Sequence, residues 1–221
     1  MTDAPIDPLA IIELTNLKAA GKLKALAAHP HLGMKPEWIE ELVRNQDLDI
    51  LPILASNPAL SSNPEIIEKL ANDKGWLVRR NLAENPATVS SLAAIEKLAQ
   101  DQDPESRVAL ASNPAIASFP ELVKTLATDE DPDVRRALAS NPSLLNFPKL
   151  VKHLANDQDP NVRQSLASNP ALGAFPRIAK HLASPSSPKT SSLLAKNPAI
   201  PARTAMTKPW QTPPIRKGPT L

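Results

Sequence analysis

Residues 113–140 read NPAIASFPELVKTLATDEDPDVRRALAS, and this stretch contains the pattern that decides the fold. It opens with Asn-Pro, and a proline recurs at that place every 28 residues from Pro30 to Pro198. An asparagine precedes each proline of this series except Pro30, which follows His29. Self-similarity at a fixed period of this length is the signature of a repeat protein.

Two further proline series predict where the helices of each unit begin. One passes through Pro120 and the other through Pro132, and both suit the first helical position, where a fixed φ and a missing N–H are tolerated. Asp131 is placed as an N-cap, and the next Asn-Pro pair ends the second helix because a residue before proline is pushed out of the helical region. We therefore expect helix A over about 120–128 and helix B over about 132–140.

Both predicted helices have one apolar face, made in helix A by Leu122, Val123, Leu126 and Ala127, and in helix B by Val134, Ala137, Leu138 and Asn141. Helices of about nine residues are too short to be stable alone. Stacking them buries these faces, so we expect an all-α solenoid of about seven 28-residue two-helix units. The repeat domain spans 1–198, in units of about 1–28, 29–56, 57–84, 85–112, 113–140, 141–168 and 169–196, and 199–221 form a disordered or extended tail.

Composition excludes several classes of protein. The chain has 221 residues, 42% of them hydrophobic, which is enough for a core. Cysteine is absent, so disulfides, thiolate zinc sites and cysteine nucleophiles are excluded. No apolar run approaches the roughly 18–20 residues of a membrane span, and the opening MTDAPIDPLA lacks the basic start of a secretion signal. We expect a cytoplasmic protein without a membrane span.

The sequence contains no motif for catalysis or for a cofactor. It lacks a Gly-rich phosphate loop, Gly-x-Ser-x-Gly and His-Glu-x-x-His, and its five glycines leave little from which to build a phosphate loop. His153 and His181 lie one repeat apart without a carboxylate at ligand spacing, so they are interpreted as surface residues rather than metal ligands. We therefore expect no enzyme, no cofactor and no metal.

Polar residues also recur at the repeat period. Four arginines, each with an aspartate six residues ahead, form a ladder: Arg79, Arg107, Arg135 and Arg163, with Asp73, Asp101, Asp129 and Asp157. Stacked guanidiniums suit phosphate, but an acid accompanies every arginine, which favours ion pairs within or between units. The recurring asparagines are expected to satisfy carbonyl groups at the ends of the B helices. Trp76 stands where other units have proline and is expected to be a packing variant of that position.

The unit sequences resemble the leucine-rich repeat variant family. The resemblance rests on LVRRNLAENP (77–86), VRRALASNP (134–142) and NVRQSLASNP (161–170), and DKGWLVRR (73–80) is especially close to that family's pattern. It implies a right-handed superhelix in which an α-helix alternates with a second helix that is often 3₁₀. The units here are longer than is usual for the family, so helix B is left open as α or 3₁₀, and HEAT-like solenoids are the neighbouring alternative.

The solvent side of helix A changes from acidic to basic along the sequence. Residues 1–110 carry more acidic than basic groups, 111–221 carry the reverse, and no acidic residue follows Asp159. The tail combines prolines and basic residues with a single large aromatic, Trp210. The candidate partner-binding residues are Lys124, Lys149, Lys152, His153, Arg177, Lys180, His181, Trp210, Arg216 and Lys217.

These features favour a non-enzymatic scaffold or adaptor that binds another protein through the graded repeat surface and the tail. The same charge polarity would also permit head-to-tail self-association. A second hypothesis is a nucleic-acid-binding solenoid that uses the basic C-terminal repeats and tail. The net charge of only +2 and the acidic N-terminal half argue against this alternative.

Overall fold

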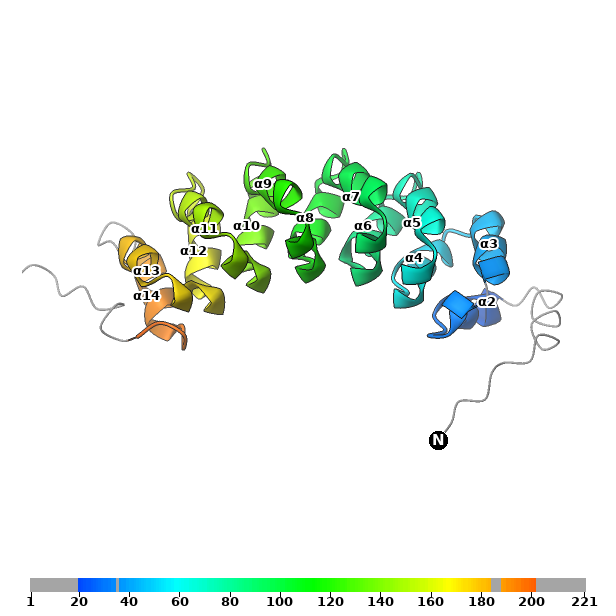
Figure 1. Cartoon of the computed structure of the whole chain (residues 1–221), viewed down its shortest axis with the longest axis horizontal. Coiled ribbons are helices and arrows are strands. Elements are labelled where there is room, and N and C mark those ends of the chain that lie inside the picture. The colour runs from blue at the N-terminus through cyan, green and yellow to red at the C-terminus, as the bar shows by residue number, and fades with distance from the viewer. Residues whose placement is uncertain (1–19, 35, 184–187, 202–221) are drawn as a thin grey trace, which may run out of the picture.

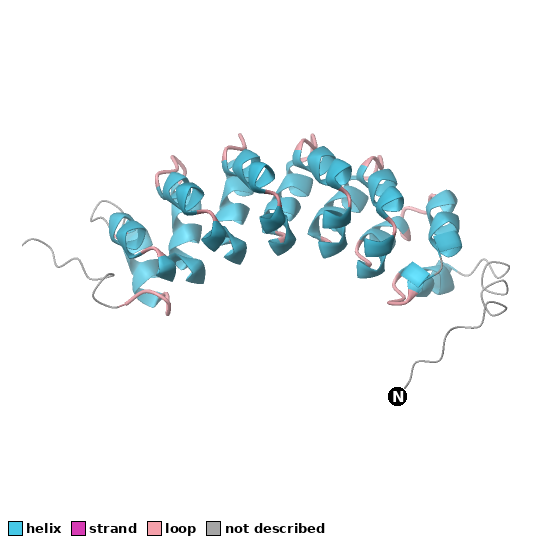
Figure 2. Cartoon of the chain, in the orientation of Figure 1, coloured by secondary structure: helices cyan, strands magenta, loops and turns pink. Residues whose placement is uncertain are grey.

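The computed structural model describes residues 20–34, 36–183 and 188–201, and this part of the protein is helical without any strand (Figure 2). The helices form an arched α-solenoid (Figure 1). The A helices are α3 (Pro36–Asn45), α5 (Pro64–Ala71), α7 (Leu92–Ala99), α9 (Pro120–Ala127), α11 (Pro148–Ala155) and α13 (Pro176–Leu182). The B helices are α2 (Ala20–Ala27), α4 (Leu51–Ala55), α6 (Trp76–Glu84), α8 (Pro104–Ser112), α10 (Pro132–Ser140), α12 (Pro160–Ser168) and α14 (Pro188–Lys196).

The predicted boundaries of the central unit are confirmed. α9 begins at Pro120 and α10 at Pro132, so both prolines occupy the first helical position. The Asp131 carboxylate caps α10 by accepting a hydrogen bond from the Asp133 N–H at 2.8 Å. Helix B is an α-helix, which settles the alternative that the sequence left open.

Each unit from 29–56 to 169–196 has the two expected α-helices and, in addition, a short 3₁₀ helix that the sequence did not predict. A 3₁₀ helix begins at the proline of each Asn-Pro pair from Asn57-Pro58 to Asn169-Pro170: η2 (Pro58–Ser62), η3 (Pro86–Ser90), η4 (Pro114–Ser118), η5 (Pro142–Asn146) and η6 (Pro170–Ala174). A shorter one, η1 (Leu32–Met34), follows His29-Pro30. The asparagine caps the segment and the proline starts it. The segment does not extend into helix A, because the residue before the next proline is held out of the helical region, as at Phe119 with φ −124° and ψ 80°.

The three kinds of helix form three rows. Each A helix from α5 onward contacts the next A helix, each B helix contacts the next B helix, and each 3₁₀ helix contacts the next 3₁₀ helix. The A helices lie along the outer, convex edge of the arch (Figure 1). Contacts between successive units thus define the architecture, as in a quasi-one-dimensional repeat protein.

The core is a continuous strip between the rows. The central unit contributes Ile116 from η4, Val123 and Leu126 from α9, and Val134 and Leu138 from α10, all of which are buried. Corresponding residues of neighbouring units belong to the same cluster. Since no unit can bury these side chains alone, the core depends on stacking.

Some predictions fall outside the described residues. They include most of the first unit, nearly all of the tail, and the tail candidates Trp210, Arg216 and Lys217. The right-handed superhelix stays a prediction. No helix within the described ranges is long and apolar enough to cross a membrane.

Candidate functional site

The recurring asparagines link successive units through their side chains. The Asn113 Nδ2 donates to the Ala83 carbonyl oxygen at 2.9 Å and to the Asn85 carbonyl oxygen at 3.1 Å, both in the preceding unit. Its Oδ1 accepts from the Ala115 N–H at 3.0 Å and so caps η4. The same three bonds are made by Asn57, Asn85, Asn141, Asn169 and Asn197. The expected role at the B-helix ends is confirmed, and the helix served is that of the previous unit.

The arginines form ion pairs that join each unit to the following one. The Arg107 Nε lies 2.8 Å from the Asp129 Oδ2 and its Nη2 lies 3.0 Å from Oδ1, a bidentate contact. Its Nη1 donates to the carbonyl oxygen of Asp101, the aspartate six residues ahead of it, at 2.7 Å. Arg79 with Asp101 and Arg135 with Asp157 repeat this arrangement. The expectation of ion pairs is confirmed for three rungs, and these guanidiniums leave no bidentate face for a phosphate track.

These pairs also alter the ionisation of their carboxyl groups. Burial on its own raises the pKa of Asp157, but the Arg135 guanidinium and the backbone N–H of Asp159 more than offset this effect. The pKa of Asp157 therefore lies below its ordinary value of 3.8. Asp101, held by Arg79 and by the backbone N–H of Asp103, has a lowered pKa for the same reasons. Both carboxylates are therefore charged at neutral pH, where they pair with arginines between units.

The exposed charges of the A helices are the strongest candidate for an interaction surface. Helices α3 and α5 carry an excess of glutamates, among them Glu37, Glu40 and Glu65, all of them exposed. At the other end the exposed charges are basic: Lys149, Lys152 and His153 on α11, and Arg177, Lys180 and His181 on α13. On α9 between them, Lys124 is exposed and lies 3.6 Å from Glu121. All seven described candidate residues thus lie on the convex row (Figure 1).

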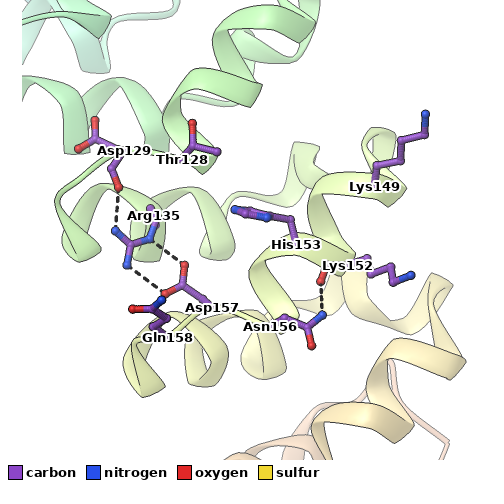
Figure 3. A pocket seen from close by; sticks show the side chains of 9 residues that line it. All are labelled: Thr128, Asp129, Arg135, Lys149, Lys152, His153, Asn156, Asp157 and Gln158. Atoms are coloured by element: carbon purple, nitrogen blue, oxygen red, sulfur yellow. Dashed lines mark hydrogen bonds and ion pairs between the residues drawn. The ribbon is translucent and has the colours of Figure 1, made fainter.

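A groove lies between the A helices α9 and α11 near the start of α12. It has a volume of about 630 Å³ and is lined by Thr128, Asp129, Arg135, Lys149, Lys152, His153, Asn156, Asp157 and Gln158. In Figure 3 the His153 ring points toward the Arg135–Asp157 pair, whereas Lys149 and Lys152 point outward. A smaller groove of about 260 Å³ occupies the equivalent place at Arg79 and Asp101, with Lys97 as its lysine. Of these two grooves, which lie at equivalent places in the repeat, the C-terminal one is the richer in basic groups.

The basic residues of α11 and α13 are brought onto neighbouring helices. The His181 Nε2 lies 3.0 Å from the Asn156 Oδ1, and the Asn156 Nδ2 donates to the Lys152 carbonyl oxygen at 2.8 Å. No group of three metal-binding side chains occurs within residues 20–34, 36–183 and 188–201. His153 and His181 are both exposed.

Trp76 occupies the place that proline fills in other units, as the repeat predicted. As the first residue of α6 it is 48% exposed, because a first helical position points away from the core, as it does for the prolines that fill this place in other units.

Comparison of the sequence with protein-family models finds no matching family, and comparison with curated proteins finds no relative. The fold and the charge distribution of the described residues are therefore the observations that bear on function.

Proposed function

We propose that this solenoid, of leucine-rich repeat variant type, is a protein-binding scaffold or adaptor whose recognition surface is the basic C-terminal part of the convex row. The observation that carries this proposal is the change in exposed charge along the A helices, from acidic on α3 to basic on α11 and α13. An acidic partner surface is repelled by the acidic end and attracted by the basic end. Lys149, Lys152 and Lys180 are exposed and have no ion-pair partner among the described residues. They are thus available to an acidic partner.

A protein partner fits this surface better than nucleic acid. Nucleic-acid binding calls for a basic track that follows many phosphates. Here the A helices carry an excess of basic groups only at α11 and α13, and three of the four ladder arginines are already in ion pairs. The remaining basic area is suited to a compact acidic patch on a protein.

A binding role is also favoured over a catalytic one. The carboxyl groups whose pKa is shifted, Asp101 and Asp157, are held in ion pairs between units. Catalytic acids and bases need such shifts at a group that faces the substrate. In this protein the same physical effect stabilises the stacking of repeats. Cytoplasmic localisation belongs to the same proposal.

The sequence of the tail supports a second contact. It contains Trp210 with Arg216 and Lys217 and carries no acidic residue. Two linked contacts raise avidity even where each is weak. Head-to-tail self-association through the opposite charges of the two ends is the related possibility for a second copy of the protein.

The proposal is tested by capture from the source cell's lysate after nuclease treatment. The charge-reversal variant Lys149→Glu/Lys152→Glu/Lys180→Glu is expected to lose the protein captured by the wild type. A matched variant, Lys74→Glu/Lys189→Glu/Lys196→Glu, makes the same charge change at exposed positions away from the A helices and is expected to retain it. Equal capture by both variants would contradict the proposal. Binding that disappears with nuclease treatment would favour nucleic acid instead.

A further inference from the structure

Arg135 has one N–H group that its ion pair leaves unused. A guanidinium carries five N–H donors. The Arg135 Nε and one N–H of Nη2 donate to the Asp157 carboxylate, and Nη1 donates to the carbonyl oxygens of Asp129 at 2.7 Å and Glu130 at 3.1 Å. The second N–H of Nη2 has no acceptor in the part of the protein that the structure describes. The side chain is 15% exposed and lines the groove between α9 and α11, through which a ligand reaches this donor.

The preceding unit shows which group suits this donor. The equivalent arginine there is Arg107, which has Asp129 as its bidentate partner and also has the Glu130 Oε1 3.9 Å from its Nη2. One repeat later the place of Glu130 is taken by Gln158, which is uncharged and lines the groove. Among the described residues, the Arg135 Nη2 therefore lacks the second carboxylate that the Arg107 Nη2 has.

The charges of the groove favour an anion. Each of the two aspartates that line it is held by an arginine of the ladder, so their charges are neutralised. Lys149 and Lys152 line the groove, point outward (Figure 3) and have no ion-pair partner within the described ranges. His153 adds a third basic group, and its ring points toward the ion pair of Arg135 with Asp157. The groove thus combines an unused donor with an excess of positive charge.

The equivalent groove between α5 and α7 lacks this excess. Its Asp73 makes no ion pair with any residue that the structure describes, so the negative charge offsets that of Lys97. The places of the two outward-pointing lysines are taken there by Ala93 and Glu96. Of the two grooves, only the C-terminal one is therefore suited to an anionic ligand.

We propose that the groove between α9 and α11 binds a glutamate side chain in an acidic segment of a partner protein. The glutamate carboxylate accepts the unused N–H of the Arg135 Nη2, and neighbouring acidic residues of the segment pair with Lys149 and Lys152. A carboxylate is favoured over a phosphate group, which carries up to about two negative charges, because the two aspartates of the groove repel the additional charge. This inference rests on the proposed protein-binding function and names the chemistry that the partner presents.

The test measures the binding of the rhodamine-labelled peptide Gly-Glu-Glu-Gly-Glu-Gly to the full-length protein by fluorescence anisotropy. Gln158→Glu places a carboxylate beside Arg135 as Glu130 lies beside Arg107. This carboxylate competes for the unused donor, so peptide binding is expected to weaken by about fivefold or more. The matched variant Gln102→Glu makes the same change at the equivalent exposed position of the smaller groove and is expected to keep the wild-type affinity. Equal affinity of the two variants would overturn the proposal.

The two lysines of the groove are tested in the same assay. Lys149→Gln/Lys152→Gln is expected to weaken peptide binding by about tenfold or more, because two ion pairs are lost. Lys74→Gln/Lys189→Gln removes the same charge at exposed positions away from the A helices and is expected to change the affinity by less than about twofold. A peptide with glutamine in place of each glutamate is expected to bind about tenfold more weakly than the acidic one. Unchanged binding in the lysine variant of the groove or with the glutamine peptide would overturn the proposal.

NMR of the protein labelled with ¹⁵N-arginine locates the peptide. We expect the side-chain Nε–H resonance of Arg135 to shift with the same saturation as the anisotropy, while that of Arg79, at the smaller groove, stays in place. A shift of Arg79 equal to that of Arg135, or no shift of Arg135 on saturation, would contradict the assignment of the site.

Inorganic phosphate and a dT12 oligonucleotide are used as competitors. If either displaces the labelled peptide at the concentration at which the unlabelled peptide does, the preference for a protein carboxylate is overturned. Peptide binding that Gln158→Glu does not affect, with lysate capture still dependent on Lys149, Lys152 and Lys180, would remove the groove site and leave the proposed function. Peptide binding in the groove without any such capture would leave the site and remove the proposed function.

Discussion

At the scale of the residue, one asparagine side chain satisfies three backbone groups. The amide is the only uncharged side-chain group with both a double donor and an acceptor on one short stem. In Asn113 the donors reach two carbonyl oxygens of the preceding unit while the acceptor caps its own 3₁₀ helix. This buried residue therefore fixes the spacing between units as well as the start of a helix.

Asn113→Ala is expected to lower the free energy of unfolding by about 2–4 kcal/mol, because two buried carbonyl groups lose their partners. Asn113→Asp keeps the cap but faces those carbonyls with a carboxylate, so an equal or larger loss is expected. The exposed Asn146→Ala serves as the control and is expected to change stability by less than about 0.5 kcal/mol. Urea denaturation checks all three, and a mild effect of Asn113→Asp would show that the cap alone matters.

Asp157 predicts a pH dependence. Its pKa is lowered in the folded protein, so its ionised form contributes stability above the ordinary value of 3.8, and this contribution is lost as the pH falls through the lower folded value. Asp157→Asn is expected to cost about 3 kcal/mol at pH 7, since Arg135 loses its buried partner. The difference from the wild type should shrink below pH 4 in melts followed by circular dichroism. A difference that does not vary with pH would contradict this account, and Asp133→Asn, at an exposed pair, is the matched control.

At the scale of the element, prolines and caps decide the helices. Helices A and B could be predicted because Pro120, Pro132 and Asp131 mark their first turns. The 3₁₀ helix was missed, since five residues carry no readable periodicity, although Asn-Pro at its start was a cap signal. The partner of each arginine could not be predicted from the sequence of one unit, because the carboxylate and the carbonyl that bind it come from different units.

The position of the A helices on the convex edge could not be predicted from the sequence either, because it depends on how the units stack.

Leu92 offers a test of how these helices begin. It is the first residue of α7 and 55% exposed, at the place where five other A helices have proline. The preceding Ser91 has φ −127° and ψ 110°, which suits a residue before proline. Leu92→Pro is therefore expected to stabilise the protein by about 0.4–1 kcal/mol. Lys97→Pro, inside the same helix, is expected to cost about 3 kcal/mol or more. A loss of stability in Leu92→Pro, measured by urea denaturation, would mean that the leucine side chain matters for packing.

At the scale of the whole molecule, the interior repeats while the exterior changes. The asparagine bonds and the ion pairs are nearly identical from unit to unit, whereas the exposed charge of the A helices reverses between α3 and α13. Where these interior contacts recur, they hold one unit to the next whatever the exposed side chains are, so the surface is free to vary for recognition.

Deleting residues 113–140 tests that interchangeability. The deletion brings Asn141 into the relation with Ala83 and Asn85 that Asn113 had, and it brings Asp157 to Arg107. The shortened protein is expected to fold with the same helical fraction per residue and a lower melting temperature. Deleting only 113–126, half a unit, puts both ladders out of register and should abolish cooperative melting. Melting is followed by circular dichroism. Similar melting of the two deletion variants would contradict the claim that the asparagine bonds and the ion pairs hold neighbouring units together.

Hydrogen–deuterium exchange of the full-length protein, alone and bound to the protein that it captures, tests the central claim most directly. We expect slower exchange on binding in α11 and α13, at the basic end of the convex row. The B helices near the acidic end should be unaffected. Protection confined to α3 and α5, or to the B-helix row near the acidic end, would contradict the claim that the basic convex surface recognises the partner.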